Sequence, residues 1–187
     1  MKSIILFACF LTSLNAYSQD SIAYKSIGIG SGVIYYPTGK IFGFAHSYSG
    51  NYIFSQHFGL QFSFDFGSGQ KNDEFYFDAA KSNILNAGLV YIPFKQMMNL
   101  QLNTSLMFLK YTNIFGTKDE ILNNNYAMSK FSTYKKSNYY GLNLGVQIPV
   151  YESSYFIVTT KLDSWISWIQ LNVLTLKLQI QYKIGKK

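Results

Sequence analysis

The clearest pattern in this sequence is an alternation of apolar and polar residues close to its C-terminal end. In residues 174–184, LTLKLQIQYKI, every second residue from Leu174 to Ile184 is apolar or aromatic, and Thr, Lys and Gln stand between them. Successive side chains of a strand point to opposite faces, so the segment predicts a strand with one apolar and one polar face. Its length is also close to the roughly 9–11 tilted residues with which a strand crosses a bilayer.

The same alternation recurs along the chain and predicts eight strands. They cover residues 27–36, 41–54, 58–67, 81–93, 99–111, 138–150 and 155–165, followed by an eighth strand that contains 174–184. Eight strands joined as successive hairpins predict an all-β fold. We expect an eight-stranded antiparallel up-and-down barrel, which leaves no open sheet edge.

The residues on the polar parity indicate which face of this barrel is outside. A soluble barrel exposes its polar face to water and carries many charges there, whereas a transmembrane barrel turns its apolar face to lipid. Here the polar parity is mostly small or uncharged: Gly28, Gly30, Gly32, Ser47, Ser49, Gln61, Ser63, Gln101, Asn103, Ser105, Asn143 and Gln147. Such residues suit the narrow lumen of an eight-stranded barrel, and the bulky apolar face would not fit inside it. The pattern favours a transmembrane β-barrel over a soluble lipid-binding barrel, which stays an alternative.

Aromatic residues gather close to the predicted strand ends, as in the interfacial girdles of membrane barrels. They are Tyr35, Tyr36, Tyr91, Phe94, Tyr111, Tyr139, Tyr140, Tyr151, Tyr155, Trp165 and Trp168.

Composition agrees with this class of protein. Charged residues make up 13% of the chain, about half of what soluble domains carry, and every basic residue is a lysine. The positive net charge suits contact with an anionic lipid surface, and it gives no reason to expect a nucleic-acid partner. No stretch of about 18 apolar residues predicts a transmembrane helix.

The N-terminal residues predict a secretory signal peptide over 1–18, followed by a single barrel domain over 19–187. Lys2 precedes a short apolar run, and Ala16 and Ser18 stand before the expected cleavage point. A secreted barrel with an even strand number has both termini in the periplasm. The polar loops predicted at 68–80 and 112–137 are then extracellular.

These two loops are the predicted contact surface, where a protein partner would bind. The residues expected to make contacts are Asn124, Tyr126, Tyr134, Lys135 and Lys136.

Four charged residues lie on the polar parity of their strands and predict a charge network inside the lumen: Asp65, Lys161, Asp163 and Lys177. The last three lie on the adjacent seventh and eighth strands. A buried charge is costly unless it is paired, so we expect these side chains to form ion pairs that close the barrel. The alternative is a narrow path for small solutes or ions.

His46 and Ser49 raise the alternative of a membrane-embedded lipid hydrolase, because eight-stranded lipid A deacylases carry His, Ser and Glu on their lipid-facing side. These two residues have opposite parity, however, and none of the three glutamates lies in a predicted strand.

Two histidines and a single cysteine give no metal site, and no cofactor is expected. The sequence therefore predicts a protein without enzymatic activity.

Three segments resemble the small porin-like outer-membrane β-barrel proteins, the PorT-like outer membrane protein β-barrel domain family. They are GLVYIPF at 88–94, YYGLNLGVQIPV at 139–150 and the terminal QYKIGKK. The resemblance covers nearly all of the chain after residue 18. It implies a location in the outer membrane of a Gram-negative cell, contact with outer-membrane lipid or lipopolysaccharide, and insertion by the barrel-assembly machinery. Members of this family often end on an aromatic residue, whereas here Tyr182 is followed by Lys183 and four further residues.

Overall fold

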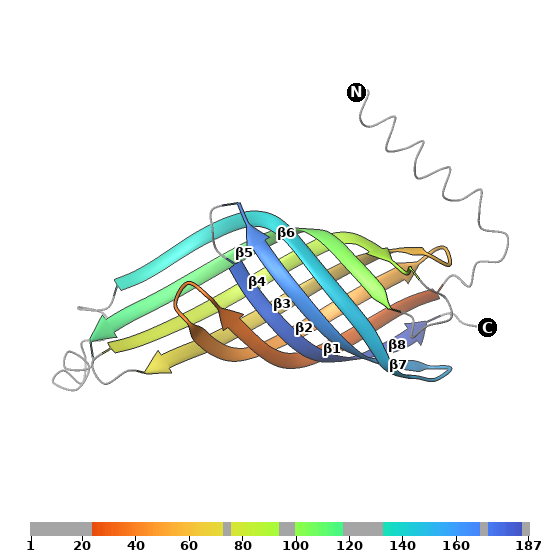
Figure 1. The fold of residues 1–187 in the computed structure, drawn as a ribbon, viewed down its shortest axis with the longest axis horizontal. Coiled ribbons are helices and arrows are strands. Elements are labelled where there is room, and N and C mark those ends of the chain that lie inside the picture. The colour runs from red at the N-terminus through yellow and green to blue at the C-terminus, as the bar shows by residue number, and fades with distance from the viewer. Residues whose placement is uncertain (1–23, 73–75, 94–99, 118–132, 169–171, 185–187) are drawn as a thin grey trace, which may run out of the picture.

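The protein is a closed barrel of eight antiparallel strands, as Figure 1 shows. The computed structural model describes residues 24–72, 76–93, 100–117, 133–168 and 172–184. The strands are β1 (Tyr24–Tyr36), β2 (Ile41–Ile53), β3 (Phe58–Asn72), β4 (Tyr76–Tyr91), β5 (Gln101–Thr117), β6 (Thr133–Glu152), β7 (Phe156–Ser167) and β8 (Asn172–Ile184). Each strand pairs with the next, and β8 returns to pair with β1. The predicted eight-stranded up-and-down fold is confirmed. In this described part of the chain, no helix is long and apolar enough to cross a membrane.

The register of the strands fixes the tilt and the width of the barrel. One row of paired residues climbs from β1 around to β8 through Ser26, Asn51, Gln61, Gly88, Ser105, Asn143, Trp165 and Val173. Ser26 also pairs directly with Lys183, ten residues further along β8 than Val173. Such a stagger in an eight-stranded barrel goes with strands tilted by roughly 35–45° and a lumen that side chains fill.

The two faces of the wall differ as the alternation predicts. Along β8 the exposed residues are Leu174 to Ile184 on even positions, and the buried ones lie on odd positions between them. Large apolar side chains stand on the outer surface, with Ile29 62% and Phe44 72% exposed. Polar side chains such as Gln179 and Ser63 are buried in the lumen. The apolar face is therefore outside.

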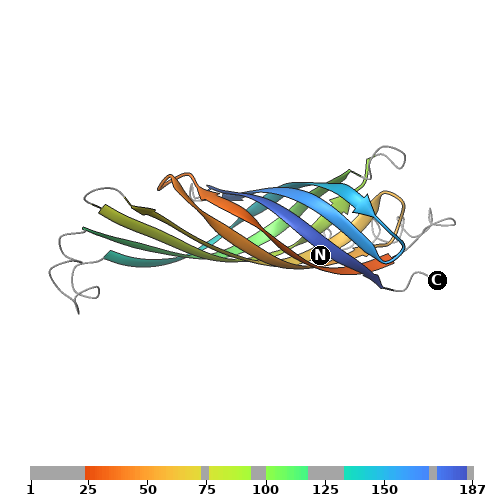
Figure 2. The same cartoon turned by 90° about the horizontal axis from the view of Figure 1, so that it is seen from below.

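Some strands extend beyond the rim of the barrel at one end. We call the end with Tyr24 and Ile184 the terminus end and the opposite end the loop end. At the loop end, β2 and β3 pair only as far as Gly43 and Gly69, and β6 and β7 pair only from Gly141 onward. Strands β3 to β6 continue beyond these points and reach past the β1–β2 turn in Figures 1 and 2. They form a four-stranded extension of the wall, the loop-end sheet, made of residues 70–72, 76–80, 112–117 and 133–139.

The loop-end sheet corrects two of the sequence-based boundaries. The segments predicted as loops at 68–80 and 112–137 are largely strand, because β3 runs to Asn72, β4 begins at Tyr76, β5 runs to Thr117 and β6 begins at Thr133. Alternation of apolar and polar residues marks only the part of a strand that has an apolar environment on one of its two faces. Beyond it both faces carry polar residues, while the backbone ladder continues.

Apolar residues also occupy the lumen toward its two ends, which corrects part of the predicted aromatic girdles. A cluster toward the loop end contains Tyr36, Tyr111 and Trp165 with Ile34, Ile84 and Leu109, and Tyr139 packs against it. These four aromatic residues were expected on the outer surface. They have the parity of the lumen, since Trp165 follows Lys161 and Asp163 at two-residue steps. Phe94 lies outside the described residues. A smaller cluster of Ile53, Val90 and Ile92 lies toward the terminus end.

Candidate functional site

The structure brings all four residues of the lumen charge network together. Lys177 Nζ lies 2.5 Å from Asp65 Oδ1 and 3.0 Å from Asp163 Oδ2. Lys161 Nζ lies 3.3 Å from Asp163 Oδ1. All four side chains are buried. Two lysines and two aspartates balance each other in formal charge, which is what burial of ions requires.

The charge network crosses the lumen, because its members come from both sides of the wall. Asp65 is on β3, whereas Lys161, Asp163 and Lys177 are on β7 and β8. Each carboxylate also accepts a bond from an amide group. Asn86 Nδ2 donates to Asp65 Oδ2 at 3.0 Å, and Asn143 Nδ2 donates to Asp163 Oδ1 at 3.1 Å. The network thus ties β3 and β4 to β6, β7 and β8.

The charge network is bounded on its loop-end side by the apolar cluster around Trp165. Lys177 Nζ lies 5.2 Å from the centre of the Trp165 ring, a distance at which a cation is attracted to the ring face. Sequence reasoning assigned Trp165 to the membrane interface. The two-residue spacing from Asp163 was the signal that places it beside the ions instead.

Amide and hydroxyl groups fill the lumen between the charge network and the terminus end. Asn51 Nδ2 donates to Gln181 Oε1 at 3.1 Å, and Gln179 Nε2 donates to Ser47 Oγ at 3.1 Å. Other buried polar atoms of this layer have no protein partner, among them both amide atoms of Gln147 and of Asn103. Buried polar groups are almost always hydrogen-bonded, so water molecules are the expected partners of these atoms.

A salt bridge between Lys183 and Glu152 lies at the terminus end, and the sequence pattern did not predict it. Lys183 Nζ lies 2.5 Å from Glu152 Oε1 and donates to the Ser153 carbonyl oxygen at 2.9 Å. This contact joins the last strand to the β6–β7 turn.

The predicted contact residues are spread over described and undescribed parts of the chain. Lys135 and Lys136 are exposed on β6 in the loop-end sheet. Tyr134 pairs with Ile114 through the backbone, and nothing is described of its side chain. Asn124 and Tyr126 lie outside the described residues.

The histidine that raised the hydrolase alternative faces outward and contacts a different serine. Ser49 is buried in the lumen and His46 is exposed, as their parity predicts. Ser31 on β1 is the cross-strand partner of His46, and its Oγ lies 2.9 Å from His46 Nδ1.

This outward serine–histidine pair lacks the surroundings of a hydrolytic site. Its neighbours on the flanking strands are Leu178 and Phe66, and no carboxylate faces outward from the described parts of β1, β2, β3 or β8. Without a carboxylate to orient the imidazole, the arrangement has no triad geometry. The pair also lies near mid-strand, whereas lipid ester groups lie at the interface. Mutual hydrogen bonding of two polar groups in an apolar band accounts for the contact.

Among the described residues, no group of three or more His, Cys, Asp or Glu side chains could hold a metal ion.

Comparison with known proteins relates the chain to outer-membrane barrels through structure alone. No protein-family model matches the sequence, and no curated protein matches it. OprG from Pseudomonas aeruginosa, an outer membrane protein, superposes with a TM-score of 0.52 at 13% identity, over 90% of this chain and 100% of OprG. Ail, the attachment invasion locus protein of Yersinia pestis, superposes with a TM-score of 0.50 at 15% identity, over 87% of this chain and 97% of Ail. At such low identity these similarities establish a shared fold: the chain has the small eight-stranded barrel architecture of these two proteins.

Proposed function

We propose that this chain is a non-enzymatic outer-membrane β-barrel protein that displays its loop-end sheet as a contact surface. The observation that carries the proposal is the combination of an apolar outer wall, a lumen closed by ion pairs and a sheet that extends past one rim. A monomer in water rarely exposes more than a few hundred Å² of continuous apolar surface, and here apolar side chains surround the barrel. Lipid is the medium that suits this wall.

Paired aromatic residues near both ends of the wall support the membrane placement. Phe108 and Tyr140 lie with ring centres 5.3 Å apart toward the loop end, and so do Phe58 and Tyr91 toward the terminus end. Aromatic rings gather at both water interfaces of membrane barrels. Members of small barrel families have short periplasmic turns and longer extracellular parts, so the terminus end is proposed to face the periplasm. Assignment to the PorT-like family and insertion by the barrel-assembly machinery belong to this proposal.

Two lysines at the base of the loop-end sheet support contact with anionic outer-membrane lipid. Lys81 and Lys110 are exposed on the outer faces of the neighbouring strands β4 and β5. The aromatic residue Phe108 precedes Lys110 on the same face. Cations directly beyond an aromatic girdle lie at the depth of lipid headgroups, where they suit the phosphates of lipopolysaccharide.

The edge of the loop-end sheet is the proposed site for a protein partner. In the described structure β6 pairs with β7 only from Gly141, while its pairing with β5 continues to Thr133. An extended segment of another protein can add to such an edge through backbone hydrogen bonds. Lys135 and Lys136 on this strand favour an acidic partner.

The lumen argues against the alternative of a solute pore. The charge network crosses the barrel, and the apolar cluster around Trp165 and Leu109 lies on its loop-end side. A conducting path would have to displace ions that are paired with one another.

Cysteine labelling on intact cells tests the proposed display. The single cysteine of the sequence, Cys9, lies in the predicted signal peptide, so the protein without a substitution serves as the blank. Lys135→Cys should react with a membrane-impermeant maleimide on intact cells. Ser154→Cys, in the exposed β6–β7 turn of the terminus end, should react only after the outer membrane is permeabilised. The reverse pattern would overturn the orientation, and labelling of neither variant on intact cells would overturn surface display.

A further inference from the structure

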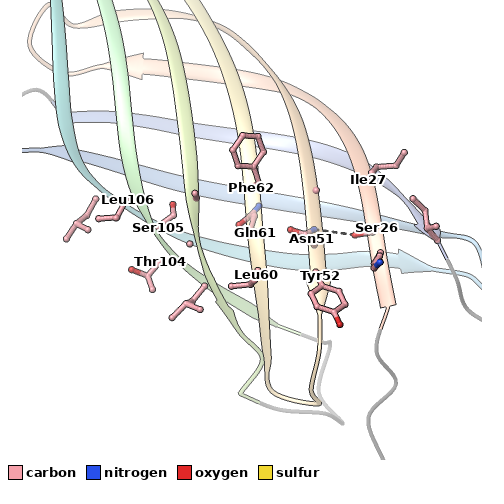
Figure 3. A pocket seen from close by; sticks show the side chains of 17 residues that line it. Ser26, Ile27, Asn51, Tyr52, Leu60, Gln61, Phe62, Thr104, Ser105 and Leu106 are labelled. Carbon is pink, nitrogen blue, oxygen red and sulfur yellow. Dashed lines mark hydrogen bonds between the residues drawn. The ribbon is translucent and has the colours of Figure 1, made fainter. Parts of the chain in front are cut away.

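An apolar groove crosses the outer surface of the barrel from β1 to β6. It has a volume of about 900 Å³, and its sides are formed by outward-facing residues that include Ile27, Leu60, Phe62 and Leu106. Inward-facing residues such as Asn51 and Gln61 alternate with them along the strands and contribute the floor. Figure 3 shows these side chains following one another from strand to strand.

The groove exists because small residues interrupt a row of large ones. Ile27, Gly50, Phe62, Ala87, Leu106 and Leu142 are successive cross-strand partners on the outer face. Gly50 presents no side chain, and a Cβ built there would have Ser26 O as its nearest atom at 3.9 Å. The space beside Gly50 is therefore open from outside.

The course of the groove matches one leaflet of a bilayer. It begins beside Lys25 and Ile184 at the terminus end and continues over β2 to β5 as far as Leu142 on β6. Five interstrand steps of about 4.8 Å give a path of roughly 24 Å. With strands tilted by roughly 35–45°, this path rises about 15 Å, half of the hydrocarbon thickness of a bilayer.

Lys25 places a positive charge where the groove begins, at the terminus end of the barrel. Lys25 is exposed on the outer face of β1, and its Nζ lies 5.6 Å from the centre of the Tyr52 ring. A lysine beside an interfacial tyrosine lies at the depth of lipid headgroups, where its ammonium group can bind a phosphate.

We propose that this groove is a binding site for a phospholipid of the periplasmic leaflet, with the phosphate on Lys25 and one acyl chain along Ile27, Phe62 and Leu106. This inference rests on the proposed function, because it requires the barrel to lie in a membrane with its terminus end in the periplasm. Lipopolysaccharide does not fit the site, since the cation lies at the opposite end from the outer leaflet. A polar solute does not fit the apolar sides.

Photo-crosslinking in nanodiscs tests the site. The probe is phosphatidylglycerol with a diazirine near the middle of one acyl chain, and labelled peptides are quantified by mass spectrometry. Labelling should concentrate on peptides of β2 to β5 relative to peptides of β7 and β8. Gly50→Leu fills the groove and should abolish this excess, and Lys25→Gln should reduce it.

Two matched variants control for general effects. Val33→Leu enlarges an outward residue of β1 that does not line the groove, and Lys40→Gln removes an exposed lysine of the β1–β2 turn at the loop end that has no proposed lipid contact. Val33→Leu should leave the labelling pattern unchanged, and so should Lys40→Gln. Labelling spread evenly around an inserted barrel, or an excess that survives Gly50→Leu, would overturn the lipid site alone. A protein that cannot be inserted at all would overturn the proposed function together with it.

Discussion

At the scale of single residues, Lys177 links the two aspartates of the charge network. Its ammonium group contacts Asp65 and Asp163 and lies against the Trp165 ring. Removing one partner of a buried ion pair leaves an uncompensated charge, which costs more than the pair itself contributes.

We expect Lys177→Met to lower the free energy of unfolding by about 3 kcal/mol, because both aspartates would stay buried with only Lys161 near them. The measurement is the urea midpoint of the micelle-bound barrel. Lys110→Met removes an exposed lysine and should leave the midpoint unchanged. Equal midpoints for Lys177→Met and the unsubstituted protein would contradict a buried, paired network.

Strand parity was enough to predict which charged residues share the lumen, since Asp65, Lys161, Asp163 and Lys177 all fall on the polar face of their strands. Parity also placed His46 and Ser49 on opposite faces. The aromatic residues were the harder case. Trp165 and Tyr36 have the chemical type of an interface residue, but their strand parity places them in the lumen, and parity decides their position.

At the scale of elements, β1 shows how glycine makes room for large lumen side chains from a neighbouring strand. A Cβ at Gly30 would lie 2.5 Å from Gln179 Cγ on β8 and 2.8 Å from Ser47 Oγ on β2. The Gln179–Ser47 hydrogen bond therefore passes over a position where any added side chain would force Gln179 or Ser47 to shift.

We expect Gly30→Val to destabilise the barrel by about 1–3 kcal/mol, because the added methyl groups displace Gln179 from its bond with Ser47. Gly50→Val is the matched control on the neighbouring strand, where the outer surface is open. Its unfolding midpoint should equal or exceed that of the unsubstituted protein. A similar loss in both variants would mean that strand glycines matter for a reason other than lumen space.

The loop-end sheet was not predicted, because the alternation that marks strands fades once both faces meet water. Backbone pairing of β5 with β6 nevertheless continues to Phe115 and Thr133. The absence of a described β7 partner before Gly141 is a matter of strand length in the fold, and local sequence does not encode it.

Hydrogen exchange should distinguish the two parts of β6. Among the described residues only β5 pairs with residues 133–139, so their amides should exchange faster than those of 141–147, which lie between β5 and β7. The measurement is exchange followed by mass spectrometry on the micelle-bound protein. Equal protection over both segments would show that something covers the outer edge of the loop-end sheet.

At the scale of the whole molecule, the outer wall and the lumen carry different kinds of side chains. The wall carries the apolar residues that suit lipid, and the lumen holds ions, amides and two apolar clusters. The barrel is closed by pairing of β8 with β1, and the loop-end sheet continues from four of its strands, β3 to β6.

A closed lumen predicts that the protein in a planar bilayer gives no stepwise single-channel currents. The ion pairs of Lys177 cross the lumen, and the buried apolar cluster that contains Leu109 and Trp165 lies on their loop-end side. Reproducible conductance steps that disappear with Asp65→Leu would contradict closure and would favour the pore.

The most direct test of the central claim, a membrane barrel with its apolar face outward, is cell fractionation followed by gel mobility before and after boiling. The protein should appear in the outer-membrane fraction, need detergent for extraction, and shift in mobility when heated, because a closed barrel stays compact until it is boiled. A protein released in soluble form without detergent would contradict the claim, since the exposed faces of residues such as Phe44 and Ile29 could not then remain in contact with water.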